Sequence, residues 1–87
     1  MNLFEFAKKI GRTIYIEARP NGEHVVSFGT DCDLIVGAKR IHSVHGRGTN
    51  MTEAIANFTN KLKGTLEFPK SFDHQYLLEV PNDISPL

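Results

Sequence analysis

The sequence predicts one α+β domain, in which two helices cover one face of an antiparallel sheet and a C-terminal β-hairpin follows. Apolar residues recur at helical spacing in two segments, one near the N-terminus and one over residues 50–63. Between residues 13 and 45, and again after residue 65, the chain is rich in the alternating β-branched and aromatic residues typical of strands. The order of elements is therefore α-β-β-β-α, and 87 residues suffice for one domain.

Both helices are marked by capping residues. Asn2 followed by Glu5 is a capping-box signature, and Gly11 supplies a stop, so we expect a short helix over residues 3–10. Asn50 followed by Glu53 repeats the signature before a longer helix that ends near Gly64. That longer helix carries one apolar stripe, made of Met51, Ala54, Ile55, Phe58 and Leu62.

A β-hairpin is expected after the first helix. Residues 13–19 alternate in polarity and predict a half-buried strand, whose apolar side consists of Ile14, Ile16 and Ala18. Pro20-Asn21-Gly22 has turn chemistry, because proline presets φ and Asn-Gly tolerates positive φ. Residues 24–29 then return as a second strand, with Val26 and Phe28 pointing inward.

The next segments are expected to complete the sheet. Residues 29–38 predict a loop with a short strand at Leu34-Ile35-Val36, which Gly37 ends. Residues 39–45 should form the third main strand and lead into a Gly46-Arg47-Gly48 turn.

The C-terminal region predicts a hairpin made of residues 65–68 and 75–80, which Pro81 terminates. Residues 1–81 should thus be a single domain and residues 82–87 a frayed tail.

Composition limits the classes of function. The 10 basic and 10 acidic residues balance, which argues against a generic polyanion binder. Cys32 is the one cysteine and cannot form an internal disulfide, and there is neither a signal-peptide pattern nor an apolar run long enough to span a bilayer. We therefore expect a cytoplasmic protein without a membrane partner.

The order of elements and three local features resemble the double-stranded-RNA-binding domain over roughly residues 3–63. Gly22-Glu23-His24 with Phe28 is similar to that family's first-hairpin motif, and Gly46-Arg47-Gly48 before Thr52-Glu53-Ala54 is similar to its glycine turn and second helix. The resemblance implies the fold and, as an alternative function, a nucleic-acid-binding module.

The chain departs from that family at the start of the second helix. The family places consecutive lysines there to bind phosphates across the duplex groove, whereas this chain has Asn50-Met51-Thr52. Because duplex affinity comes mainly from phosphate neutralisation, we expect no tight binding of duplex RNA.

Two further families share short motifs with the chain. Glu53-Ala54-Ile55 resembles a helical step of HicB-type antitoxins, which implies pairing with a toxin. The stretch from Gly46, through Lys61-Leu62-Lys63-Gly64-Thr65-Leu66, to Glu79-Val80-Pro81 resembles small early-region proteins of phages of Gram-positive bacteria. That resemblance implies an accessory protein in the host cytoplasm, which inhibits or sequesters a host defence factor, either a protein or an anionic nucleotide ligand.

The best candidate site is an anion site at the start of the second helix. A helix N-terminus presents unpaired N–H groups, and glycines let an anion approach the backbone. The candidate residues are Arg47, Gly48, Thr49 and Asn50, with His45 and Arg40 from the basic stretch before them. The alternative is that the glycines serve only the backbone path and Asn50 satisfies the helix end.

Catalysis and metal binding have little support. His42, His45 and Cys32 are metal-ligand types, but strand periodicity would turn the two histidines to opposite faces, so we expect no metal and no cofactor. Cys32 stands between two aspartates, which disfavour a thiolate, and no Ser-His-acid spacing is present. We therefore expect a protein that is not an enzyme.

The late strand is apolar on both faces and predicts self-association, most simply as a dimer. The candidate interface residues are Tyr76, Leu77, Leu78 and Val80.

Overall fold

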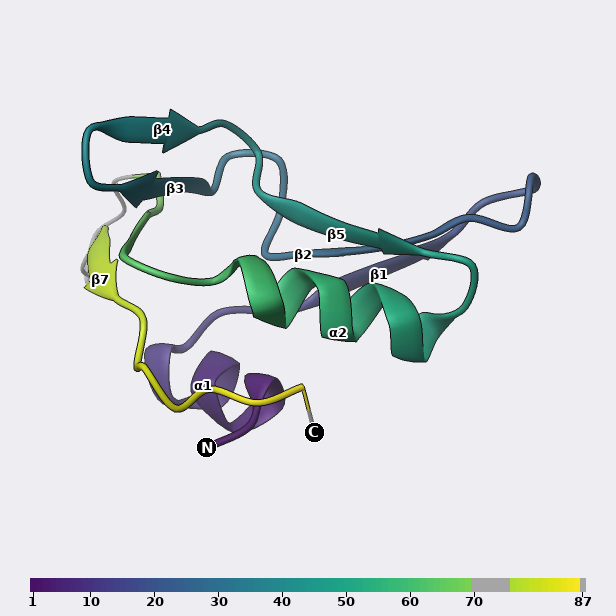
Figure 1. Ribbon diagram of the computed structural model, residues 1–87, viewed down its shortest axis with the longest axis horizontal. Coiled ribbons are helices and arrows are strands. Elements are labelled where there is room, and N and C mark those ends of the chain that lie inside the picture. The colour runs from purple at the N-terminus through teal and green to yellow at the C-terminus, as the bar shows by residue number, and fades with distance from the viewer. Residues whose placement is uncertain (70–75, 87) are drawn as a thin grey trace.

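The computed structural model describes residues 1–69 and 76–86 and confirms the α+β class, with a helix at each end of a run of strands and a C-terminal hairpin (Figure 1). The elements in chain order are α1 (Leu3–Ile10), β1 (Tyr15–Ala18), β2 (His24–Ser27), β3 (Asp33–Val36), β4 (Lys39–Ile41), β5 (His45–Gly48), α2 (Met51–Lys61), β6 (Thr65–Glu67) and β7 (Leu77–Glu79).

The described strands form two sheets. β1, β2 and β5 make a three-stranded sheet in that order, and the second sheet has the order β4-β3-β6-β7. All pairs are antiparallel. The hairpin β3–β4 lies between β2 and β5 in the sequence but belongs to the second sheet. There the C-terminal hairpin β6–β7 pairs with the free side of β3 through β6. The expected sheet is thus divided, and the C-terminal hairpin completes its second part.

The expected single strand over residues 39–45 is broken. β4 ends at Ile41, Ser43 adopts a positive φ of 51°, and β5 starts at His45 in the other sheet. The Asp33 carboxylate accepts a hydrogen bond from the Ser43 backbone N–H at 3.1 Å, and the Ser43 hydroxyl donates to the Thr30 carbonyl. These contacts hold a backbone conformation that non-glycine residues rarely adopt.

The Gly46-Arg47-Gly48 segment was expected to be a turn and is instead strand β5. Both glycines face α2, and they are needed because helix and strand lie in direct backbone contact. A Cβ at Gly46 would overlap the backbone of Phe58, and one at Gly48 would overlap the backbone nitrogen of Ala54. The glycines therefore serve the packing of α2 on β5.

The predicted capping box is confirmed at α1, whereas α2 keeps only its first half, because the Glu53 side chain accepts from Thr49 and not from the Asn50 N–H. The Asn2 side chain accepts from the Glu5 N–H at 2.8 Å while Glu5 accepts from the Asn2 N–H at 2.9 Å, and Gly11 ends α1 in the left-handed region. The Asn50 side chain accepts from the Glu53 N–H at 2.8 Å at the start of α2.

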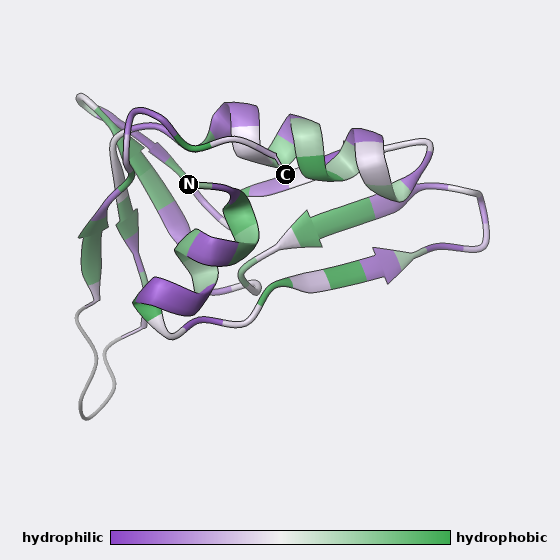
Figure 2. Ribbon diagram, turned by 90° about the horizontal axis from the view of Figure 1, so that it is seen from below, coloured by the Kyte–Doolittle hydropathy of each residue, from purple (hydrophilic) through white to green (hydrophobic). Residues whose placement is uncertain are grey.

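The core is centred on Phe28, which follows β2. Its ring makes edge contacts with Phe6 of α1 at 6.3 Å, with Phe58 of α2 at 5.3 Å and with Phe68 after β6 at 5.7 Å between ring centroids. Both helices and the second sheet thus meet at one side chain on the inner face of the first sheet. Figure 2 shows apolar residues along both helices and along the strands of the first sheet.

β1 is more exposed than its alternating pattern predicted. β1 is an outer strand of its sheet, and α2 packs on β5 and β2 rather than on β1 (Figure 1). All four residues of β1 are exposed, and Ile16, expected on the buried side, is 43% exposed. Val26 and Phe28 are buried as predicted.

The chain ends are joined rather than frayed as expected for residues 82–87, of which residue 87 lies outside the described range. Ser85 forms a parallel bridge with Asn2, its carbonyl accepts from the Leu3 N–H at 2.8 Å, and its N–H donates to the Met1 carbonyl at 3.0 Å. Ile84 packs against the core. The N-terminal helix is thereby tied to the segment after β7.

Replacing Phe58 with alanine should nearly unfold the protein. Phe58 is fully buried against Phe28, and truncating a buried phenylalanine costs about 3–5 kcal/mol, comparable with the whole stability of a small domain. Thermal or urea denaturation measures this loss. Met51→Ala on the same helix is the control, because Met51 is half exposed and its loss should cost under about 0.5 kcal/mol. Equal effects of both variants would contradict the assigned buried face.

Candidate functional site

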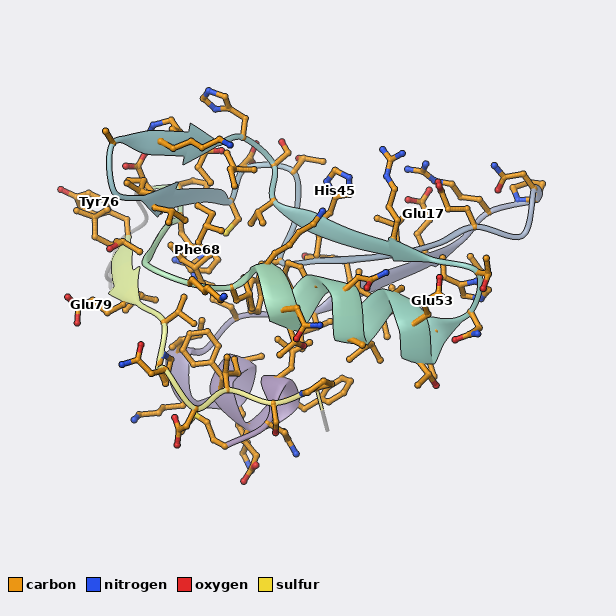
Figure 3. All side chains as sticks on the ribbon, in the orientation of Figure 1. Glu17, His45, Glu53, Phe68, Tyr76 and Glu79 are labelled. Atoms are coloured by element: carbon orange, nitrogen blue, oxygen red, sulfur yellow. The ribbon has the colours of Figure 1, made fainter. Side chains whose placement is uncertain are left out.

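Arg47 and His45 lie on the outer face of the first sheet, away from α2. Gly46 and Gly48 face the helix, and strand residues alternate between faces, so His45 and Arg47 point to the opposite side. Figure 3 shows His45 and Glu17 projecting on that side, whereas Glu53 lies at the first turn of α2.

Arg47 is engaged by side chains of its own sheet. Its Nε donates to His45 Nε2 at 3.0 Å, and its guanidinium lies 3.8 Å from the Glu23 carboxylate. The other ring nitrogen of His45, Nδ1, lies 2.7 Å from the Ser43 carbonyl, to which it donates in the tautomer whose Nε2 accepts from Arg47. Arg47 is therefore part of a solvated polar row.

The start of α2 is already capped by a carboxylate. Glu53 accepts from the Thr49 N–H at 3.2 Å and lies 3.3 Å from the Thr49 hydroxyl. An open depression of about 490 Å³ at this end is bordered by Arg47, Gly48 and Thr49, but also by the carboxylates of Glu23 and Glu53. An anion at this position would face two negative charges. The geometry therefore favours the alternative interpretation, in which the backbone N–H groups at the start of α2 are bonded by the Asn50 and Glu53 side chains.

Arg40 lies in the second sheet, apart from Arg47. Its guanidinium donates to both carboxylate oxygens of Glu67, at 3.0 and 3.1 Å, and to Asp33 at 3.1 Å. The hydrogen bond from Ser43, with those from Arg40 and His42, holds the pKa of Asp33 below its ordinary value. This ion-pair network fixes the kink between β4 and β5 and leaves Arg40 no part in the predicted anion site.

The metal-ligand types are also separated. His42 Nδ1 lies 3.1 Å from Asp33, and His45 is bonded to Ser43 and Arg47. Cys32 is buried, and burial together with the Asp33 carboxylate raises the pKa of its thiol to about 12. Over residues 1–69 and 76–86, the structure brings no three His, Cys, Asp or Glu side chains together as metal ligands.

A second depression opens where the first sheet meets the second, at the end of β2. It has a volume of about 510 Å³. Its walls are charged and aromatic and include Arg12, Tyr15, Glu17, Asp31 and Phe68. Residues 28–32, which follow β2, also line it.

Arg12 is the unusual residue of this depression. Its guanidinium carbon lies 4.3 Å from the centroid of the Phe68 ring, a cation–π contact. Its Nε and Nη2 atoms are buried and have no hydrogen-bond partner among residues 1–69 and 76–86. No other side-chain nitrogen or oxygen in that part of the chain is in the same condition. Arginine cannot lose its proton, so these donors remain charged and unsatisfied.

No sequence signal marks this site. Arg12 follows the predicted stop Gly11 and precedes a strand, where a basic residue is ordinarily solvated. Only the folded chain places it over Phe68, which lies more than fifty residues later in the sequence.

The predicted interface on the late strand is only partly exposed. Val80 is buried in the core. Leu78 packs against the core and pairs with Leu66 of β6. Tyr76 and Leu77 are 41% and 49% exposed. One face of this strand is thus covered by the chain's own core, and only the other face is open to solvent.

None of the described helices is long and apolar enough to cross a membrane. Compared with known proteins, the chain matches no protein-family model, and neither a curated protein nor a solved structure shows significant similarity to it.

The network around Asp33 should make stability depend on acidic pH. The pKa of Asp33 is lowered in the folded state, so its contribution is complete above the ordinary value of 3.8 and is lost as pH falls through the lowered value. Melting temperatures of the wild type and Asp33→Asn, measured from neutral pH down to pH ~2, should therefore converge on acidification. Asp31→Asn is the matched control, and a constant gap between wild type and Asp33→Asn would contradict the assignment.

Proposed function

We propose that this protein is a non-catalytic binding protein that holds an anionic, nucleotide-type ligand in the depression around Arg12. Sequestering such a ligand would inhibit a host factor, which is the role implied by the resemblance to small early-region phage proteins. The observation that carries the proposal is the buried, unpaired edge of the Arg12 guanidinium.

An unsatisfied buried donor is costly to the fold. Leaving a buried polar group without its partner costs about 1–3 kcal/mol, and more for a charged group. Nε and Nη2 lie on the same edge of the guanidinium, and this edge forms the paired hydrogen bonds that bind a carboxylate or phosphate. The described protein groups supply no acceptor to these donors. A ligand anion would supply the missing acceptors when the guanidinium turns out of its buried position towards the depression.

The other walls suit the rest of a nucleotide. Tyr15 is 57% exposed and offers a ring on which a base can stack. The carboxylates of Glu17 and Asp31 can accept hydrogen bonds from sugar hydroxyls or exocyclic amino groups. They also repel a second anionic group, so a monophosphate suits the site better than a polyphosphate. A volume of about 510 Å³ is typical of small-molecule pockets.

A covalent reaction is not supported by the groups beside Arg12. Cys32 is the thiol among the residues that line the depression, and a thiol with a pKa of about 12 is protonated at neutral pH. The arrangement supports capture of a ligand rather than its conversion.

The alternative of a nucleic-acid-binding module predicts a different result. With Asn50 and Glu53 at the start of α2, no cluster of cations is available there to neutralise phosphates. Fluorescence anisotropy at physiological salt should show no submicromolar binding of duplex RNA. Tight binding with a steep salt dependence would favour this alternative. The third alternative, a HicB-like antitoxin, instead predicts a stable complex with a toxin encoded beside it.

Arg12→Met should remove nucleotide binding without harming the fold. Losing a charge-assisted contact costs about 1.5–3 kcal/mol, or roughly a ten- to hundredfold loss of affinity for AMP in isothermal titration calorimetry. Methionine keeps a contact with Phe68 and removes the unpaired donors, so the melting temperature should stay constant or rise. A gain of 1 kcal/mol corresponds to about 4–8 °C in a domain of this size.

Arg47→Gln is the matched control, because Arg47 lies on the outer face of β5 outside the depression, and it should retain wild-type affinity. Loss of binding in Arg47→Gln alone would place the ligand at the start of α2 instead. Failure of AMP, adenosine and inorganic phosphate to bind the wild type at millimolar concentration would refute the proposal.

A further inference from the structure

β1 is a free sheet edge with an exposed apolar side. It pairs with β2 on one side, and no described strand pairs with it on the other. Its sequence has the alternation of a half-buried strand, yet Ile16 is 43% exposed and Ala18 is exposed too. Another chain could bury the apolar side of such a strand and pair with its free edge, because unpaired edges with apolar residues are association surfaces.

The backbone groups of this edge are available for pairing. The Arg19 N–H donates to the Glu23 carbonyl at 2.8 Å, so Arg19 bonds towards β2. Antiparallel strands alternate the direction of their backbone groups, and the N–H and C=O groups of Ile16 and Ala18 therefore point to the open side.

The opposite edge of the same sheet is closed. The Asn57 amide donates to the Arg47 carbonyl at 2.6 Å, and Lys61 Nζ donates to the His45 carbonyl at 2.9 Å. Both donors come from α2 and occupy the acceptors that an added strand on β5 would need. In the second sheet, the outer strand β4 carries Lys39 and Arg40, charges that discourage edge pairing.

We propose that β1 pairs antiparallel with β1 of a second copy, about a two-fold axis at Ile16, to form a continuous six-stranded sheet. In this register Ile16 lies opposite Ile16 of the second copy, and Ile14 lies opposite Ala18. The exposed side chains of Ile16 and Ala18 and the half-buried Ile14 then lie together on a single face of the paired sheet.

The register is self-complementary on the other face as well. Tyr15 lies opposite Glu17 of the second copy, so the phenol can donate to a carboxylate at both ends of the pair. An axis at Glu17 would instead set two carboxylates against each other, which destabilises a cross-strand pair. An axis at Ala18 would set Ile16 opposite Pro20, which has no N–H to donate.

The second copy is thus favoured as the occupant because the edge complements itself in hydrogen bonding, apolar contact and charge. A strand of four residues buries little surface, so the dimer belongs to the weak and reversible class. Its population should rise with protein concentration.

Sedimentation velocity over a concentration series tests the dimer. Ile16→Asp places two carboxylates at the axis and should raise the dissociation constant by about tenfold or more. Leu77→Asp on β7 is the matched control, because Leu77 is similarly exposed at 49% and should leave the dimer intact. Circular dichroism checks that both variants stay folded. A monomer at every concentration, or a dimer lost only in Leu77→Asp, would overturn the pairing.

A cysteine pair tests the register in folded protein. Tyr15 and Glu17 of the second copy form a non-hydrogen-bonded pair, whose Cα atoms are about 4.5 Å apart and within reach of a disulfide. Mixing Tyr15→Cys with Glu17→Cys under mild oxidation should give a cross-linked heterodimer, while each variant alone should not cross-link. Cys32 is buried and should not compete. Cross-linking of Glu17→Cys alone, or none in the mixture, would exclude the register.

Discussion

The edge contact between Phe28 and Phe58 connects the parts of this molecule, because Phe28 also touches Phe6 and Phe68. These rings come from the end of β2, both helices and the segment after β6. A small domain buries a limited fraction of its surface, so a single shared contact carries much of its cohesion. The two sheets have no common strand in the described residues, and the aromatic cluster joins their inner faces.

The close approach of α2 to β5 follows from the same core. Phe58 reaches Phe28 because the helix backbone lies directly on Gly46 and Gly48, where side chains would collide. The glycines thus turn Arg47 to the outer face and away from the helix start. At that start, Glu53 satisfies the Thr49 N–H. The resulting charge balance weakens the anion site that the sequence suggested.

Arg12 shows the opposite balance. Most charged side chains near it in sequence lie in solvent or in ion pairs, such as Arg19 with Glu23 at 2.7 Å. Arg12 is instead held over Phe68, with part of its guanidinium buried and unpaired. The free-energy cost of burying unsatisfied donors persists when the surrounding fold enforces it. Such costs concentrate at sites where a protein binds a ligand or partner. The proposed ligand site and the proposed dimer edge share Tyr15 and Glu17, so occupancy of one should influence the other.

The sequence by itself determined the features that depend on neighbouring residues. The capping residues Asn2 and Asn50 set the helix starts, Gly11 set a helix end, and the apolar stripe with Phe58 set the buried face of α2. These signals are local, since a cap or a period of 3.6 involves residues within one or two turns. The α+β class and the C-terminal hairpin followed from them.

Only the tertiary structure decided how the strands divide and where the candidate site lies. The kink at Ser43 depends on Asp33, ten residues away, and it moves Arg40 and Arg47 into different sheets. The exposure of Ile16 follows from the position of β1 at the sheet edge, beyond the strands on which α2 packs. The burial of the Arg12 guanidinium depends on Phe68. No local pattern encodes such contacts, because they arise from the packing of segments that are distant in the chain.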